Sequence, residues 1–206
     1  RIRRRERDND RARGRTGGRT GSGPEFWFSD RARALWFEQD PAFDDEIRRR
    51  FGAAVDAAQA GGFAHWCDSA DGTLALLILI DQMSRNINRG SPRAFAGDPR
   101  ALAVAMQAVA AGIDRGFDFS HRRFFYLPYE HSEDPAVQAR SLQLFADLAA
   151  TCAPHEKEEA EDQYLYARKH ADIIARFGRY PHRNDCLGRP CTPEELAFLA
   201  EWDSPF

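Results

Sequence analysis

Residues 74–86 constrain the fold of this 206-residue chain more than any other stretch. The first part, residues 74–80, is apolar without interruption, so the element that it forms must be buried on every side. The stretch is too short to cross a membrane, which takes about 20 apolar residues. Polar side chains follow abruptly, and a helix places two of them, Asp81 and Arg85, on one face. We therefore expect a central buried helix whose polar end finds partners elsewhere in the fold, because an unpaired buried charge is costly.

Proline marks helix starts along the rest of the chain. It follows a potential N-cap residue at four places, namely after Asp40, Asp98, Asp134 and Thr192. Apolar residues then recur at helical spacing, and no stretch alternates with the two-residue period of a strand. The sequence predicts a compact all-α fold of about eight antiparallel helices joined by short loops.

Charge divides the chain into two unequal parts. Residues 1–20 hold nine arginines and three acidic residues, a net charge of +6; the whole chain carries −3, so the remainder carries −9. We expect residues 1–24 to be a disordered basic arm or a tail left from cloning, and residues 25–206 to form a single helical domain. An acidic body argues against nucleic acid as its partner. No apolar leader or membrane span is present, so we expect a cytoplasmic protein without membrane contact.

Three polar stretches stand out against this helical background, and together they resemble one family. They are Ile80-Asp81-Gln82-Met83-Ser84-Arg85-Asn86, Glu130-His131-Ser132-Glu133-Asp134 and Gly178-Arg179-Tyr180-Pro181-His182-Arg183-Asn184. With these motifs the chain resembles the bacterial domain-of-unknown-function family 924, over residues 26–206. The resemblance implies a helical fold similar to tetratricopeptide-like α–α arrays. It implies no established activity, so no catalytic role is carried over from the family.

The polar stretches also contain the candidate site residues. Acid–base chemistry requires a histidine whose second nitrogen is oriented by a carboxylate, and this predicts Glu130, His131 and His182 as candidate catalytic residues. Arginines with amide and carboxylate neighbours suit a small anion. The candidate binding residues are Asp81, Arg85, Asn86, Glu133, Arg179, Arg183 and Asn184. The spacing is not that of a helical zinc site, so we expect no metal, and whether a cofactor binds is unknown from the sequence.

Two functional interpretations stay open at this point, and whether the protein is an enzyme stays open with them. In one, the cluster binds a small anionic molecule at the helix ends. In the other, the protein is a tetratricopeptide-like scaffold for a protein or peptide partner, and the charged residues form a closed structural network. Geometry separates the two: a ligand site requires an open cavity beside the cluster, whereas a purely structural network is sealed by its own ion pairs.

Overall fold

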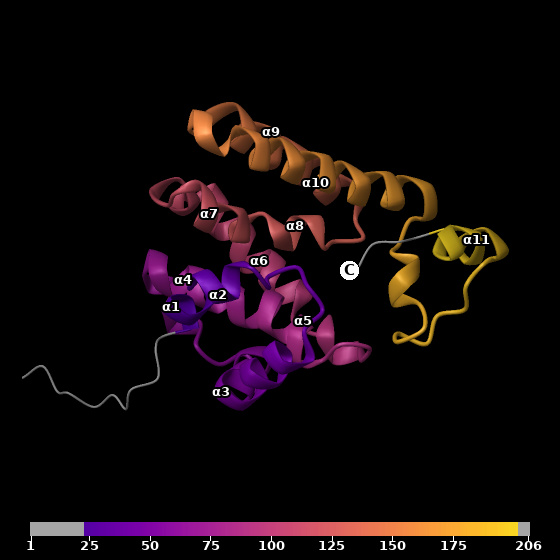
Figure 1. Cartoon of the computed structure of the whole chain (residues 1–206), viewed down its shortest axis with the longest axis horizontal. Helices are drawn as coiled ribbons and strands as arrows, with labels where there is room; N and C mark the ends of the chain where they lie inside the picture. Colours follow the sequence, from indigo (N-terminus) through magenta and orange to yellow (C-terminus); the bar gives the residue numbers. More distant parts are fainter. Residues whose placement is uncertain (1–22, 202–206) are drawn as a thin grey trace, which may run out of the picture.

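A computed structural model describes residues 23–201, and the expectations for residues 1–22 lie outside that range (Figure 1). The described residues form helices, turns and loops without a strand, so the predicted all-α class is confirmed. The α-helices are α1 (Gly23–Trp27), α2 (Asp30–Arg33), α3 (Pro41–Gln59), α4 (Ala70–Leu77), α5 (Ser84–Ile87), α6 (Asp98–Ala110), α7 (Phe119–Arg122), α8 (Leu127–Glu130), α9 (Pro135–Thr151), α10 (Lys157–Phe177) and α11 (Pro193–Glu201). Shorter turns connect them: η1 (Ala64–Asp68), η3 (Pro92–Ala94), η4 (Ile113–Gly116), η5 (Arg123–Phe125), η6 (Pro154–Glu156) and η7 (Pro181–Arg183).

The central helix runs through α4, a π-helical segment η2 (Ile78–Met83) and α5. Residues 74–80 are all buried, as their unbroken apolar character predicts. Helix α3 packs along η2 and α5, while α6 packs against α4 and η2. The π-helical widening in the middle of the helix was not predicted. It covers Asp81 and Gln82, and such widenings are frequent at functional sites.

Most of the predicted helix starts are confirmed by the capping geometry. The Asp40 carboxylate accepts a hydrogen bond from Phe43 N, and the Asp134 carboxylate accepts one from Ala136 N. Thr192 and Glu195 cap one another reciprocally at the start of α11. The prediction for Asp98 was wrong, because the cap position is taken by Gly97 and the Asp98 carboxylate turns towards two arginines.

Helices α7 to α10 lie together on one side of the group formed by α1 to α6, which contains the central helix (Figure 1). Helices α9 and α10 form the longest hairpin and pack together over α8. After α10 the chain turns through η7, against which α11 packs. The expected count of helices and the tetratricopeptide-like pairing hold approximately, since several helices are single turns. Among residues 23–201, no helix combines the length and the apolar character that crossing a bilayer requires.

Candidate functional site

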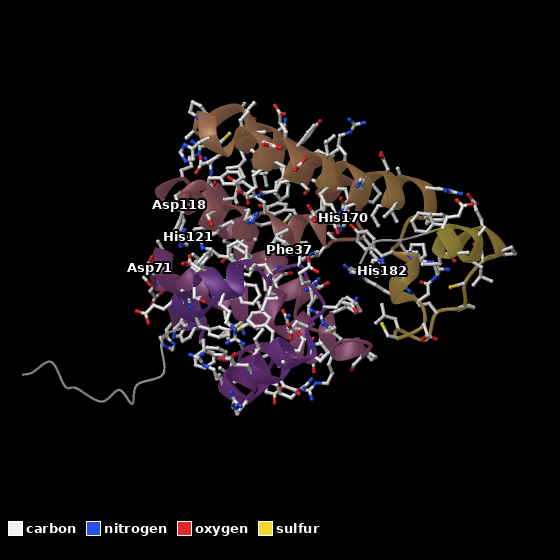
Figure 2. All side chains as sticks on the ribbon, viewed as in Figure 1. Phe37, Asp71, Asp118, His121, His170 and His182 are labelled. Atoms are coloured by element: carbon white, nitrogen blue, oxygen red, sulfur yellow. The ribbon has the colours of Figure 1, made fainter. Side chains whose placement is uncertain are left out.

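A cavity of about 780 Å³ lies beside the polar end of the central helix. Segments that are far apart in the sequence contribute to it, as Figure 2 shows for Phe37, His170 and His182. The inner polar residues are Gln82, Arg85, Asn86, Glu130, His131, His170, His182 and Arg183. The apolar lining includes Trp36, Phe37, Ala94, Phe95, Leu127 and Phe145. A volume of this size holds a small organic molecule, and an apolar wall with a few convergent polar groups is typical of ligand sites.

Asp81 is a buried carboxylate held by three donors. Its Oδ1 lies 2.7 Å from His131 Nδ1 and accepts from Arg85 Nη1 at 3.1 Å, while its Oδ2 accepts from Gln82 Nε2 at 2.6 Å. Burial by itself raises the pKa of a carboxyl group, but the positive charge of Arg85 and the bond to His131 outweigh it here. The pKa of Asp81 therefore falls well below its usual range, and the side chain stays ionised.

His131 is oriented by this carboxylate. Because a carboxylate only accepts, the ring proton lies on Nδ1 and Nε2 carries the lone pair. Burial and the charge of Arg85 lower the pKa of His131, although Asp81 opposes them, so the ring is neutral at pH 7. Nε2 has no hydrogen bond to another residue of the described part. An imidazole with one nitrogen fixed by a carboxylate can accept a proton at its other nitrogen.

Glu130 and His170 form a second buried pair on the cavity wall. Glu130 Oε1 lies 3.4 Å from His170 Nδ1, and both side chains are almost completely buried. Burial, reinforced by the charge of Asp81, raises the pKa of Glu130 from 4.5 to about 8. Burial also lowers the pKa of His170 well below its usual value. At neutral pH the carboxyl group of Glu130 is therefore mostly protonated and can donate a proton.

Two arginines share one carboxylate at the inner end of the cavity. Asp98 Oδ2 accepts from Arg85 Nη2 at 3.0 Å and from Arg183 Nη1 at 3.3 Å. The guanidinium of Arg183 lies 4.5 Å from the ring centroids of both Phe95 and Tyr180, and its side chain is only 8% exposed. Its Nε has no hydrogen-bond partner among the described residues. A guanidinium has five N–H donors, so Arg183 retains donors for an acceptor that enters the cavity.

The structure brings together most of the predicted site residues. Asp81, Arg85, Glu130 and His131 line or support one end of the cavity, and Asn86, His182 and Arg183 join them. Asn86 also donates to the Asp44 carboxylate, at 2.7 Å. Burial and the charge of Arg183 lower the pKa of His182 to about 3, so this ring is neutral.

Three predicted binding residues lie outside the cavity. Arg179 forms a two-bond pair with Glu195 of α11, at 2.6 and 2.8 Å. Glu133 accepts from Arg189 and from Tyr180 N, and Asn184 accepts from Arg189. These residues hold the loop that carries His182 and Arg183, so their place is in positioning the cavity wall.

Sequence reasoning missed Asp98, Gln82 and His170. His170 follows Ala167 by three positions and precedes Ile174 by four. Those two residues are buried, and helical periodicity puts His170 on the same face of α10. The sequence therefore contained an indication that His170 is buried. The sequence contained no indication of a site role for Asp98, because an Asp-Pro pair is typical of a helix N-cap.

No group of three or more His, Cys, Asp or Glu side chains among the described residues is placed to hold an ion. The cavity is lined by the neutral imidazole of His131, the protonated carboxyl group of Glu130 and the guanidinium of Arg183. Groups of these kinds can exchange protons with a ligand or donate hydrogen bonds to an anion.

Comparisons with known proteins place this chain in a family. The model of the family described as "Bacterial protein of unknown function (DUF924)" matches residues 24–203. A solved structure, that of a protein of unknown function, ATU0120, from Agrobacterium tumefaciens, is similar with 37% sequence identity and a TM-score of 0.74. The similarity covers 86% of this chain and 95% of that one. The search of curated proteins found no match. The chain belongs to the DUF924 family of bacterial proteins, the family that its three polar motifs indicated.

Proposed function

We propose that this protein is an enzyme that binds a small organic anion in the cavity and transfers protons to and from it. The observation that carries the proposal is His131 on the cavity wall, held from behind by Asp81 at 2.7 Å, together with the incompletely bonded guanidinium of Arg183 on the same wall. One group is prepared to take a proton, and the other is prepared to hold a negative charge.

In this proposal His131 is the general base and Glu130 the general acid. His131 Nε2 accepts a proton from the substrate or from a water molecule, and the ionised Asp81 stabilises the resulting imidazolium. Glu130 donates the proton that the product requires. The two residues have pKa values displaced in opposite directions, which is the pattern that separates a base from an acid in one site. A proton passed from His131 back to Glu130 restores the starting state.

Arg183 and Arg85 hold the substrate in this scheme. Arg183 contributes its spare donors, while Arg85, fixed by Asp81 and Asp98, contributes charge. The alternative, a scaffold for a protein or peptide, has less support, because the unusual polar residues surround a cavity and do not repeat along an exposed helix face. That alternative becomes an outcome of the test.

The first test is a thermal-shift screen of small carboxylates and phosphates. A ligand at one hundred times its Kd contributes about 2.7 kcal/mol, which raises the melting temperature of a chain of this size by roughly 5–10 °C. We expect at least one anion to stabilise the wild type and Arg176→Gln, whose arginine pairs with Glu194 on the surface, but not Arg183→Gln. If no anion does so while a stoichiometric protein partner is recovered, the scaffold interpretation replaces this proposal.

The second test separates binding from chemistry. The protein is incubated in D₂O with the anion that the screen identifies, and mass spectrometry follows product formation and deuterium incorporation. We expect His131→Asn to bind the anion within about threefold of the wild type and to lose turnover by 100-fold or more. A variant that keeps the wild-type rate would show that His131 is not the base.

A further inference from the structure

We infer that the substrate is a monocarboxylate with an apolar body, and not a phosphorylated compound. This inference rests on the proposed function and narrows its substrate class. It comes from three properties of the cavity: the balance of charges around the arginines, the acidic residues at the rim and the aromatic wall.

The charges at the inner end are already balanced. Arg85 and Arg183 face Asp81 and Asp98, and each guanidinium is within 3.3 Å of at least one of these carboxylates. A phosphate dianion would add two negative charges to a site that has no positive charge in excess, and buried charge without compensation is costly. A carboxylate adds one negative charge instead of two, so this cost is smaller, and its two oxygens match the planar donors of a guanidinium. The spare donors of Arg183 therefore suit a monoanion.

The exposed part of the cavity lining holds one carboxylate without an ion pair among the described residues, whereas the exposed Arg89 is neutralised by Asp44. Glu159 and Asp162 of α10 both line the cavity and are exposed to solvent. Glu159 is matched by Arg123 at 2.8 Å, whereas the structure gives Asp162 no ion pair within the described residues. A nucleotide or another polyanion would carry its charges past these carboxylates, which raises the free energy of entry. A single carboxylate that leads into the cavity meets less repulsion.

The wall provides a surface for an apolar body. Trp36, Phe37, Phe95, Leu127 and Phe145 line the same cavity. Phe37 is 51% exposed, one of the few large apolar side chains of the described residues with so much exposure. A ligand that covers these rings removes apolar surface from water on both sides of the contact. Small polar acids would leave that wall uncovered.

Isothermal titration calorimetry with a homologous series tests the inference on the intact chain. The probes are hexanoate, octanoate and decanoate, with decanol and decyl phosphate as matched compounds that change only the head group. We expect affinity to rise by up to about fourfold for each methylene, as burial of the added carbon predicts. Decanoate should bind at least tenfold more tightly than either decanol or decyl phosphate.

Two variants test which part of the cavity wall binds each end of the ligand: Arg183 for the carboxylate and Phe37 for the alkyl chain. Arg183→Gln should lower the affinity for decanoate at least tenfold, whereas Arg176→Gln on the surface should leave this affinity unchanged. Phe37→Ser removes an exposed ring, so it should not disturb folding. The variant should lower the affinity for decanoate more than that for hexanoate, because the longer chain extends further along the apolar wall.

The outcomes distinguish this inference from the proposed function. Decanoate binding that requires Arg183 and increases with chain length supports both. If decyl phosphate binds more tightly than decanoate, or if affinity is independent of chain length, the inference is overturned while anion binding at Arg183 stands. If none of these anions binds the wild type, the inference is overturned, and the wider screen of anions then decides the proposed function separately.

Discussion

Asp81 keeps a negative charge in the interior because its neighbours supply every bond that water would have supplied. Its side chain is 2% exposed, and donors from Gln82, Arg85 and His131 surround its two oxygens. A buried carboxylate in such surroundings contributes little net stability, but the loss of one partner leaves the others in an unfavourable state. Asp81 therefore couples the site to the stability of the fold.

Asp81→Ala should lower the free energy of unfolding by about 3 kcal/mol. The substitution leaves Arg85 with Asp98 as its remaining acidic partner and removes the group that orients His131. Urea denaturation measures the effect. Asp56→Ala is the matched control, since Asp56 pairs with Arg93 on the surface and its loss should change stability by less than about 0.5 kcal/mol. If both variants lowered the free energy of unfolding by the same amount, burial of the Asp81 ion pair would not explain the effect.

Glu130 should make stability depend on pH in the opposite direction to an ordinary carboxylate. Its pKa is about 8 in the folded protein and near 4.5 when the side chain is free, because burial and the charge of Asp81 favour the neutral form and Arg85 opposes them only partly. Between these values the folded state holds more protons than the unfolded state. The stabilisation is therefore complete below pH 4.5 and is lost as the pH rises to 8.

Urea denaturation of the wild type and of Glu130→Gln at pH 5, 6, 7 and 8 measures this loss. The stability of the wild type relative to the variant should fall by about 1 kcal/mol per pH unit over this range. Glu158→Gln replaces an exposed glutamate on α10 and should run parallel to the wild type. A difference between wild type and Glu130→Gln that does not change with pH would rule out a protonated Glu130.

Single residues also show where sequence reasoning reaches its limit. The sequence indicated that Asp81, Arg85, Glu130 and His131 need partners, and the structure brings these residues together. It did not separate Arg179 from Arg183, because both lie in the same polar loop. The two arginines differ in their ion-pair partners: Arg179 pairs with Glu195 of α11, and Arg183 pairs with Asp98 beside the cavity. Which carboxylate approaches which guanidinium depends on tertiary packing, and a local motif contains no information about that.

At the scale of secondary-structure elements, Gly97 permits the close approach of the start of α6 to the π-helical segment of the central helix. A Cβ atom built on Gly97 would lie 2.5 Å from the carbonyl oxygen of Ile80, closer than such atoms come in proteins. Gly97 has an ordinary negative φ of −84°, so its requirement is for space and not for backbone conformation. This contact places Asp98, the next residue, where it bridges Arg85 and Arg183.

Gly97→Ala should therefore destabilise the protein by about 1–3 kcal/mol, the usual cost of overpacking. It should also weaken anion binding, because a shift of α6 moves Asp98. Gly52→Ala makes the same chemical change within α3, where the new methyl group has only an ordinary contact of 3.8 Å with Arg48. That variant should gain up to about 1 kcal/mol, since alanine favours a helix. Thermal unfolding and calorimetry measure both; a neutral Gly97→Ala would mean that the interface yields easily.

Elements with strong local signals were the ones that sequence predicted well. N-caps at Asp40, Asp134 and Thr192 are fixed by residues within three positions, so their hydrogen bonds follow from the local sequence. The π-helical segment was not predictable in this way. Nothing in its residues, Ile78–Met83, distinguishes it from a segment of an ordinary α-helix.

At the scale of the whole molecule, the cavity is assembled from parts of the chain that the sequence separates widely. The central helix supplies Arg85, the end of α8 supplies His131, α10 supplies His170, and η7 supplies Arg183. The first two could be associated by their need for partners, but no local pattern indicates an empty space between them. The sequence therefore predicted the polar cluster and the helical class, while the cavity itself emerged only from the packing of the helices.

The segment after α10 closes this assembly, and one residue outside the cavity holds it in place. Glu133 accepts from Arg189 at 2.7 and 3.0 Å and from Tyr180 N at 2.8 Å, so it joins the start of α9 to the loop around η7. Glu133→Gln keeps the size of the side chain but weakens these charge-assisted bonds. Arg183 should then lose part of its fixed position, although Glu133 itself does not line the cavity.

Hydrogen–deuterium exchange measured by mass spectrometry tests this role. In Glu133→Gln, peptides that cover residues 179–190 should exchange at least tenfold faster, whereas those within α9 and α10 should remain as protected as in the wild type. Decanoate should bind more weakly, since ordering the loop then costs part of the binding free energy. Glu194→Gln removes only a surface pair with Arg176 and should change neither measurement. If exchange in residues 179–190 stays the same in Glu133→Gln, other contacts hold the loop, and the wall of the cavity does not depend on this ion pair.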